Sequence, residues 1–205
     1  MILIDNQCFP FNNLFKYSFN KTHIIIISCE SYQKMKFRNR FVVAGSNGEI
    51  NLSVPVQDGR NKKTVFKDVR ICYDENWQIN HWRTIVSCYN RSPFFEFYRD
   101  SLEPFFVNRR PFLFDYNLDI LLWLQSVLHF KGKIEVVESL PPQFATEELE
   151  DVRNKCLPGS YQNEPSIYYP QVFEDRIGFK PNLSILDLLF NTGPDAGNIL
   201  MKGNE

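Results

Sequence analysis

Four cations alternate with other residues in the stretch KMKFRNRF, at Lys34, Lys36, Arg38 and Arg40. In a β-strand, side chains two residues apart share a face and lie about 7 Å apart. Two like charges at that distance repel by about 0.6 kcal/mol in water and by about 2.4 kcal/mol at an effective dielectric of 20. Such a row must therefore either face water or bind an anion.

Two interpretations of this row stay open. A charged edge strand discourages aggregation of sheets, although lysine alone would serve that purpose. The Arg38-Asn39-Arg40 core adds forked guanidiniums, which suit bidentate recognition of phosphate or carboxylate. We therefore predict an anion-binding or substrate-binding site made of Lys34, Lys36, Arg38, Asn39 and Arg40.

His81 is the candidate for general acid–base catalysis, because an unperturbed imidazole has a pKa of about 6.5 and exchanges protons near neutral pH. The alternative is a helix histidine that is solvated or makes a structural hydrogen bond. Cys88 follows two helical turns later, at about 10 Å, which is too far for a nucleophile–base hydrogen bond. We therefore assign catalysis, if there is any, to His81 alone.

No pattern in the sequence indicates a particular metal or cofactor. Acidic pairs one turn apart, Glu96 with Asp100 and Asp115 with Asp119, are more often solvated helix faces than metal ligands. The five cysteines are scattered and contain no Cys-x-x-Cys, which argues against zinc and disulfides. The glycine-containing stretch 45–48 is typical of a hairpin turn rather than a phosphate-binding loop. We predict no metal site and leave the cofactor unknown.

Charge is distributed unevenly along the chain. Residues 1–70 hold 11 Lys and Arg against 5 Asp and Glu, whereas residues 135–205 hold 5 against 12. The acidic last third and the lack of a nucleic-acid-binding motif disfavour nucleic acid as a partner. The longest aliphatic run, Ile24–Ile27, is far shorter than the roughly 20 residues of a membrane span. The N-terminus lacks a basic signal-peptide region, so we expect a cytoplasmic protein.

Strands and helices that could position these residues follow from the apolar patterns. Residues 22–28, 34–43, 51–56 and 65–73 have strand patterns, and 134–137 predicts one further short strand. Helical patterns cover 77–89, 93–106, 115–130 and 183–190. We predict one α+β domain over residues 1–205. A small, mainly antiparallel sheet would fill the strand-rich part, about 1–73, and the helix-rich part, about 74–205, would contain the additional strand.

Several blocks of sequence, in order, resemble the WbqC-like family: ESYQKMKFRNRFVVAGSNGEINLSVPV, HWRTIVSCYNRSPFFEFYRD, PFLFDYNLDIL and YYPQVFEDRIGFKPNLSILDLLFNTGP. The resemblance implies a bacterial, cytoplasmic protein whose relatives are encoded among genes for surface-polysaccharide (O-antigen) biosynthesis. Many relatives begin with a His-Gln-Pro pattern, whereas this chain has Asn6-Gln7-Cys8 and lacks the histidine.

The resemblance also implies residues that support the site, in addition to the basic stretch and His81. These are Tyr32, Trp82, Tyr89, Asn117, Gln171, Asp187 and Asn191.

Three functional hypotheses follow. The first is an enzyme that transfers a group to an anionic intermediate of surface-polysaccharide biosynthesis, such as a nucleotide sugar. The second is a non-catalytic binding or assembly protein that recognises an anionic ligand or an acidic partner. In the third, the basic and acidic parts of the chain neutralise each other, and Arg38 and Arg40 pair with carboxylates such as Asp187. The sequence does not determine the oligomeric state.

Overall fold

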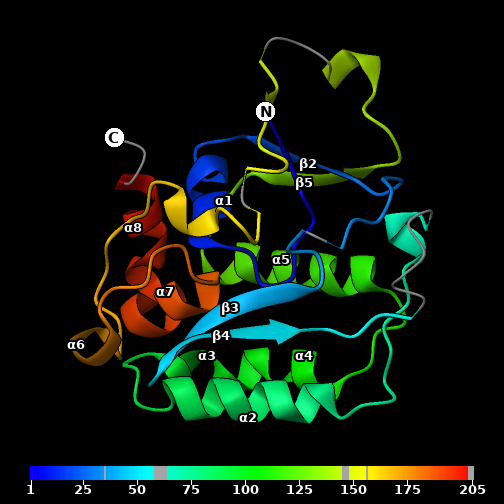
Figure 1. Cartoon of the computed structure of the whole chain (residues 1–205). Coiled ribbons are helices and arrows are strands. Elements are labelled where there is room, and N and C mark those ends of the chain that lie inside the picture. The colour runs from blue at the N-terminus through cyan, green and yellow to red at the C-terminus, as the bar shows by residue number, and fades with distance from the viewer. Residues whose placement is uncertain (35, 58–63, 145–147, 156, 203–205) are drawn as a thin grey trace.

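The computed structural model describes residues 1–34, 36–57, 64–144, 148–155 and 157–202. Within this part of the chain, four parallel strands form a sheet in the order β5-β2-β1-β6, and two antiparallel strands form a separate hairpin (Figure 1). The strands are β1 (Ile2–Ile4), β2 (His23–Ile27), β3 (Arg40–Gly45), β4 (Gly48–Ser53), β5 (Lys133–Val137) and β6 (Glu150–Asp151).

Helices follow most of the strands along the chain. The α-helices are α1 (Asn12–Ser18), α2 (Trp77–Tyr89), α3 (Phe95–Leu102), α4 (Pro104–Val107), α5 (Leu113–Val127), α6 (Glu174–Ile177), α7 (Ile185–Thr192) and α8 (Ala196–Lys202). The short 3-10 helices are η1 (Phe66–Asp68), η2 (Pro142–Phe144), η3 (Tyr161–Asn163) and η4 (Gly193–Asp195). No described helix is long and apolar enough to cross a membrane.

The parallel sheet is built on two strands that are apolar on both faces. β1 reads Ile-Leu-Ile, and β2 has four consecutive isoleucines, so neither strand has a face suited to water. Strands of this kind are typical of parallel sheets that are covered on both sides. The chain connects β1 to β2 through α1, and Ile2 lies opposite Ile24 in parallel register. The first 27 residues therefore form a strand–helix–strand crossover.

The hairpin separates α2 from the parallel sheet in the view of Figure 1. Its turn is the Ser46-Asn47 pair, followed by Gly48, whose positive φ of 131° suits glycine. β3 is almost fully buried, because α2 and α7 both contact it. The predicted hairpin is confirmed.

Part of the fold prediction is wrong. The mixture of helices and strands is confirmed, but the N-terminal sheet is not mainly antiparallel, because β1 and β2 pair in parallel with β5 and β6. Residues 36–39 form bends and turns, and the predicted strand 34–43 begins only at Arg40. The predicted strand 65–73 contains η1 and isolated bridges instead. Alternating residue types suggested a strand at 34–43. In the structure, however, the side chains of Lys36 and Arg38 turn inward and pair with Asp5 and Glu30.

The helix predictions fare better. Helix 77–89 is α2, the predicted helix 115–130 corresponds to α5, and 183–190 corresponds to α7. The predicted helix 93–106 is divided into α3 and α4, and the second begins at Pro104, which lacks the N–H that would continue the first. The prediction of a single domain stays a prediction. One large buried core nevertheless includes residues from both the strand-rich and the helix-rich parts.

Candidate functional site

The four parallel strands end at one edge, and charged residues follow β1, β2 and β6 there. Asp5 directly follows β1, Glu30 lies three residues beyond β2, and Arg153 lies two residues beyond β6. The carboxyl edge of a parallel sheet is where open α/β proteins bind their ligands. We therefore take this edge as the candidate functional site.

Asp5 is the buried centre of the charged cluster at this edge. Its Oδ1 accepts hydrogen bonds from Nζ of Lys36 at 2.9 Å and from Nη2 of Arg38 at 3.3 Å. Its Oδ2 accepts from the backbone N–H of Asn154 at 2.9 Å. Burial alone would raise the pKa of Asp5, but the Asn154 N–H and the two cations outweigh it, and the pKa is lowered. Asp5 is therefore an ionised carboxylate and a weak base.

From Asp5 the ion pairs continue outward to the surface. Arg38 also pairs with Glu30, Glu30 accepts from Arg153 at 2.5 Å, and Arg153 binds Asp151 with a shortest distance of 2.6 Å. The exposed fraction of the side chain rises along this series from 1% at Arg38 to 45% at Asp151. Three acids and three bases thus alternate in one chain of contacts: Lys36, Asp5, Arg38, Glu30, Arg153 and Asp151.

This arrangement corrects the expectation of a bare row of cations. Lys36 and Arg38 are buried and neutralised by Asp5 and Glu30, which come from the N-terminal third and not from the acidic C-terminal part. Arg38 also stacks on the ring of Phe66, with its guanidinium carbon 4.4 Å from the ring centroid. Burial of two cations is tolerable only when they are paired in this way.

The remaining residues of the basic stretch have different roles. Lys34 is exposed, and its backbone carbonyl accepts a hydrogen bond from Nη2 of Arg40 at 3.2 Å. The side-chain amide of Asn39 donates to the carbonyl of Val54 at 2.9 Å, which ties the stretch to the end of the hairpin. The amide nitrogen of Asn39 is therefore directed to the hairpin.

Tyr32 and Asn117 have contacts with the basic stretch, and their role in a site stays a prediction. Burial raises the pKa of Tyr32, and the positive charges of Arg40 and Arg38 partly offset that rise, so both guanidiniums are close to it. The amide nitrogen of Asn117, on α5, donates to the backbone carbonyl of Arg38 at 2.7 Å and to that of Asn6 at 3.3 Å. These contacts join the end of β1 to the basic stretch.

Polar atoms without a partner gather around these contacts. Two carbonyl acceptors fix the orientation of the Asn117 amide, and the carbonyl of Phe114 fixes that of Asn6, so the oxygen of each amide points elsewhere. Buried groups of this kind nearly always have partners in proteins. Asn6 Oδ1, Asn117 Oδ1 and Arg38 Nε, in residues that make these contacts, have none among the described residues, and neither do Gln7 Oε1 and Arg40 Nε in nearby positions of the chain.

His81 lies outside this group of contacts. Its ring packs edge-on against Trp77 and Phe41, with centroids 5.2 and 5.9 Å away, and it interacts with the backbone of Ser53. Burial lowers the pKa of His81 to about 4, only partly offset by Ser53, so the imidazole is neutral at pH 7. Trp82 stacks on Phe106 at 5.6 Å and fills the core beside α4. Neither residue is brought to the carboxyl edge by a described contact.

Four of the supporting residues meet at a second place, around the fully buried carboxylate of Asp187. Its oxygens accept from the hydroxyl of Tyr89 at 2.7 Å, the hydroxyl of Tyr169 at 2.8 Å and the amide of Gln171 at 3.0 Å. Asn191 donates to the backbone carbonyl of Asp187 at 2.7 Å. Burial raises the pKa of Asp187 to about 6, although the three donors act against it.

Hydrogen-bond directions show that the Asp187 network holds the fold together. The hydroxyl of Tyr89 accepts from the N–H of Ala44, and that of Tyr169 accepts from the amide of Asn12, so both hydroxyls must donate to the carboxylate. The network therefore joins α7 to α2, β3 and α1. Its groups are saturated by one another, which leaves them little capacity to bind a substrate.

Among the described residues, no three His, Cys, Asp or Glu side chains are grouped as metal ligands. The sequence interpretation missed Asp5, Glu30 and Arg153 as members of the site. Their signal was position, because Asp5 and Glu30 each follow a short run of buried aliphatic residues that could have been identified as parallel strands.

Comparison with known proteins gives two matches. The model of the WbqC-like protein family matches residues 6–161 and 157–199, which confirms the resemblance. An uncharacterized protein of Mycobacterium tuberculosis (strain ATCC 25618 / H37Rv), Rv1507c, is 24% identical over 227 residues, which cover 97% of this chain and 96% of that protein. No solved structure matches.

Proposed function

The chain belongs to the WbqC-like protein family, and from this premise we propose that it binds an anionic, hydroxyl-rich small molecule, of the nucleotide-sugar class, at the carboxyl edge of its parallel sheet. Transfer of a group to that molecule, in the cytoplasm and during surface-polysaccharide biosynthesis, is the reaction that we propose. The partner is thus a small molecule and not a nucleic acid.

The proposal rests on buried donors and acceptors of residues 6, 7, 38, 40 and 117 that have no partner among the described residues. The Nε–H groups of Arg38 and Arg40 can donate to a phosphate or carboxylate. The amide oxygens of Asn6, Gln7 and Asn117 can accept from hydroxyl or amino groups. A sugar that carries a phosphate offers both kinds of partner in one molecule, which neither an inorganic ion nor an apolar ligand does.

The ion pairs would give this site its rigidity. Arg38 uses its terminal nitrogens for Asp5, Glu30 and the carbonyl of Ser31, so its guanidinium plane is fixed and its Nε–H keeps one direction. Donors that are held in place before a ligand arrives need no reorganisation when charge appears beside them. The three acids and three bases of the cluster neutralise one another. The charge of the ligand would therefore be balanced by Arg40 and Lys34, which lie nearer the surface.

The second candidate function is binding without catalysis. The position and pKa of His81 favour it, because a neutral imidazole enclosed by Trp77 and Phe41 supplies no proton to the carboxyl edge. Asp5 does not replace His81 as a general base, because its lowered pKa makes it a weak base. Incubation with a nucleotide sugar and candidate group donors separates the two functions, because only an enzyme converts the sugar.

Replacement of Gln7 by methionine tests the site. Methionine has nearly the same length and removes a buried oxygen that has no described partner, so the variant should unfold at the same or a higher temperature. The same change should abolish the rise in unfolding temperature that UDP-N-acetylglucosamine produces in the unmodified protein, since a ligand stabilises only the state that binds it. Thermal unfolding with and without the nucleotide sugar measures both effects.

A glutamine elsewhere provides the matched control. Gln78, on α2, donates to the carbonyl of Asn108, and Gln78→Met should leave the ligand-induced shift intact. Inorganic phosphate should produce a smaller shift than the nucleotide sugar, because it occupies only the guanidinium donors. A nucleotide-sugar shift that persists in Gln7→Met, or the lack of any shift in the unmodified protein, would reject this site.

A further inference from the structure

A stripe of polar side chains on α2 and just beyond it has no role in the site described above. Thr84, Ser87, Cys88 and Arg91 follow one another at i, i+3, i+4 and i+7. Residues at this spacing are neighbours on one face of a helix. The hydroxyls of Thr84 and Ser87 and the thiol of Cys88 therefore share one face of α2, and Arg91 lies two residues beyond its end.

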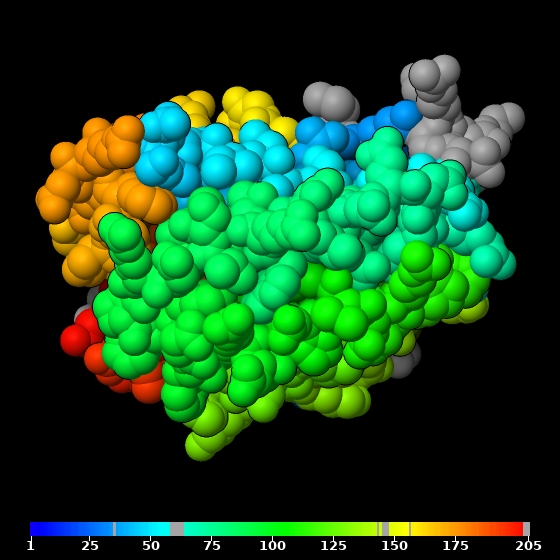
Figure 2. All heavy atoms as spheres, turned by 90° about the horizontal axis from the view of Figure 1, so that it is seen from below, coloured from blue at the N-terminus to red at the C-terminus, as the bar shows by residue number. Residues whose placement is uncertain are grey.

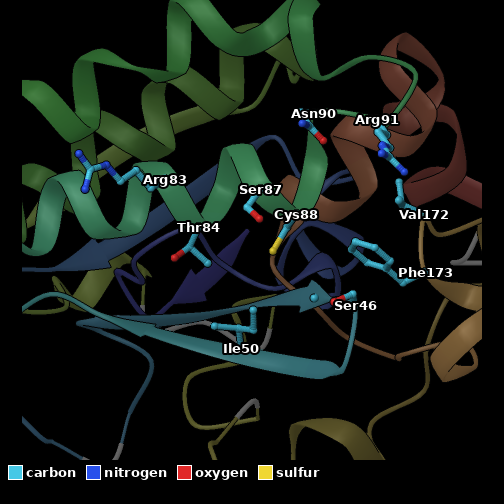
Figure 3. Close-up of a pocket in the computed structure, with 11 residues that line it drawn as sticks. Ser46, Ile50, Arg83, Thr84, Ser87, Cys88, Asn90, Arg91, Val172 and Phe173 are labelled. Carbon is cyan, nitrogen blue, oxygen red and sulfur yellow. The ribbon is translucent and has the colours of Figure 1, made fainter.

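This stripe forms one wall of a groove. The hairpin supplies the other wall through Gly45, Ser46 and Ile50, and Val172 and Phe173 close one end (Figure 3). The groove has a volume of about 580 Å³, which lies within the usual range of small-molecule sites. In Figure 2 the residues of the hairpin, of α2 and of the segment around 170–176 lie side by side on one face of the molecule.

A second hollow continues the groove past Arg91. It has a volume of about 530 Å³ and shares Arg91, Val172 and Phe173 with the first. Pro93, Pro170 and Asn191 line its far side. The combined space is therefore elongated rather than round, and Arg91 lies near its middle.

Two arginines set the charge of the first hollow. Arg83 lies at one end, with its guanidinium directed away from the other labelled side chains, and Arg91 lies at the other, beside Val172 and Phe173 (Figure 3). Neither guanidinium has an ion pair or hydrogen bond to a described residue, and no acid is among the 11 residues that line the hollow. Arg83 is on α2, and Arg91 lies eight positions later, two residues beyond the end of that helix. Unpaired cations at both ends of a hollow raise the local concentration of anions.

The thiol in the lining of the groove is not activated for reaction. Cys88 is the only thiol in its lining, and burial together with the charge of Asp187 raises the pKa of Cys88 to about 11. A thiol with this pKa is protonated at neutral pH and is a poor nucleophile. Between the two arginines, the hydroxyl of Ser87 and the amide of Asn90 remain as hydrogen-bonding groups for a ligand, whereas the hydroxyl of Thr84 donates to the carbonyl of Asn80 at 2.8 Å and can only accept.

We infer that this groove is a second binding site, distinct from the carboxyl edge, for an elongated small molecule that carries a phosphate group at each end and hydroxyl groups between them. Arg83 and Arg91 bind one phosphate each, and Ser87 and Asn90 hydrogen-bond the middle. The inference does not depend on the proposed function, because it uses none of the residues of the carboxyl edge.

A pair of sugar phosphates tests the two-ended requirement. Fructose 1,6-bisphosphate carries a phosphate at each end, and fructose 6-phosphate lacks one of them. Isothermal titration calorimetry at constant ionic strength should show that the bisphosphate binds at least about tenfold more tightly, as expected for one additional charge-assisted contact. Arg83→Gln and Arg91→Gln should each reduce bisphosphate affinity to the level of the monophosphate.

Three control variants distinguish binding in the groove from general attraction to surface cations and from binding at the carboxyl edge. Arg99→Gln removes a surface cation on α3 that pairs with Glu96, and it should leave both affinities unchanged. Ser87→Trp fills the groove and should abolish the preference for the bisphosphate over the monophosphate, whereas Gln7→Met should leave that preference unchanged. Equal affinities for the two sugars, or bisphosphate binding that survives both arginine replacements, would overturn the inference. Because Arg83 and Arg91 are exposed, their variants should unfold at the temperature of the unmodified protein.

Discussion

Arg38 and Asp5 are 33 positions apart in the sequence, yet Nη2 of the arginine lies 3.3 Å from Oδ1 of the carboxylate inside the protein. The contact joins the end of β1 to the turn that precedes β3, and it links the parallel sheet to the hairpin. A cation that the sequence presents as part of an exposed row is therefore an internal connection between the two sheets.

Replacement of Asp5 by asparagine should cost about 3–5 kcal/mol of unfolding free energy, because it leaves Lys36 and Arg38 buried beside a neutral group. Asp119→Asn is the matched control, since that carboxylate pairs with Arg110 where both side chains are about 40% exposed. The control should cost no more than about 1 kcal/mol. Urea unfolding of the two variants measures the difference, and equal costs would contradict a buried cluster.

His81 should make the protein sensitive to acid. Its pKa is about 4 in the folded protein and about 6.5 when unfolded, so between these values the unfolded chain binds more protons and stability falls as the pH is lowered. Relative to His81→Gln, the unmodified protein should lose about 3 kcal/mol between pH 6.5 and pH 4. Unfolding free energies of the two proteins, measured across this pH range, test the expectation. A difference that does not change with pH would show that the imidazole is freely solvated.

Tyr169→Phe should destabilise the Asp187 network by about 1–3 kcal/mol, because the carboxylate loses a donor and Asn12 loses an acceptor. The variant should also raise the pKa of Asp187 beyond about 6. The missing donor destabilises the ionised form of Asp187 more than the protonated form. The loss of unfolding free energy should therefore be larger at pH 7.5 than at pH 5. Tyr168→Phe is the control, because Tyr168 is the exposed neighbour of Tyr169 and, among the described residues, its hydroxyl donates only to Glu174. Chemical unfolding at both pH values should show almost no effect of this replacement.

Gly193→Ala should cost about 2–4 kcal/mol, since Gly193 has a positive φ of 57° and an added Cβ would lie 2.4 Å from the ring of Phe94. Gly159 provides the comparison, because a Cβ there meets nothing within 4 Å. Thermal unfolding of Gly159→Ala should match the unmodified protein. If both alanines were tolerated equally, the end of α7 would not need the left-handed conformation.

Local patterns in the sequence were enough to locate much of the secondary structure. The helical stripe of Trp77 and Ile85 predicted α2, and Ser46-Asn47-Gly48 predicted the turn of the hairpin. These signals depend on neighbours within a few residues, so they survive without knowledge of the fold. The same holds for the family, whose motifs lie in order along the chain and whose model matches residues 6–161 and 157–199.

Strand pairing and the partners of the charges depended on contacts between distant residues. The isoleucines of β2 indicated a buried strand, but only the folded chain shows that β1 and β5 flank it in parallel. The alternation of Lys36 and Arg38 indicated a strand face, yet both side chains turn inward because Asp5 and Glu30 lie there.

The sequence by itself determined the family, the principal helices, the hairpin turn and the presence of a basic stretch, since each depends on residue types at short spacing. The tertiary structure alone decided which cations are neutralised, that His81 is enclosed by aromatic rings, and that Arg83 and Arg91 remain unpaired among the described residues. The physical reason is that burial and pairing depend on which distant segments the parallel sheet brings together.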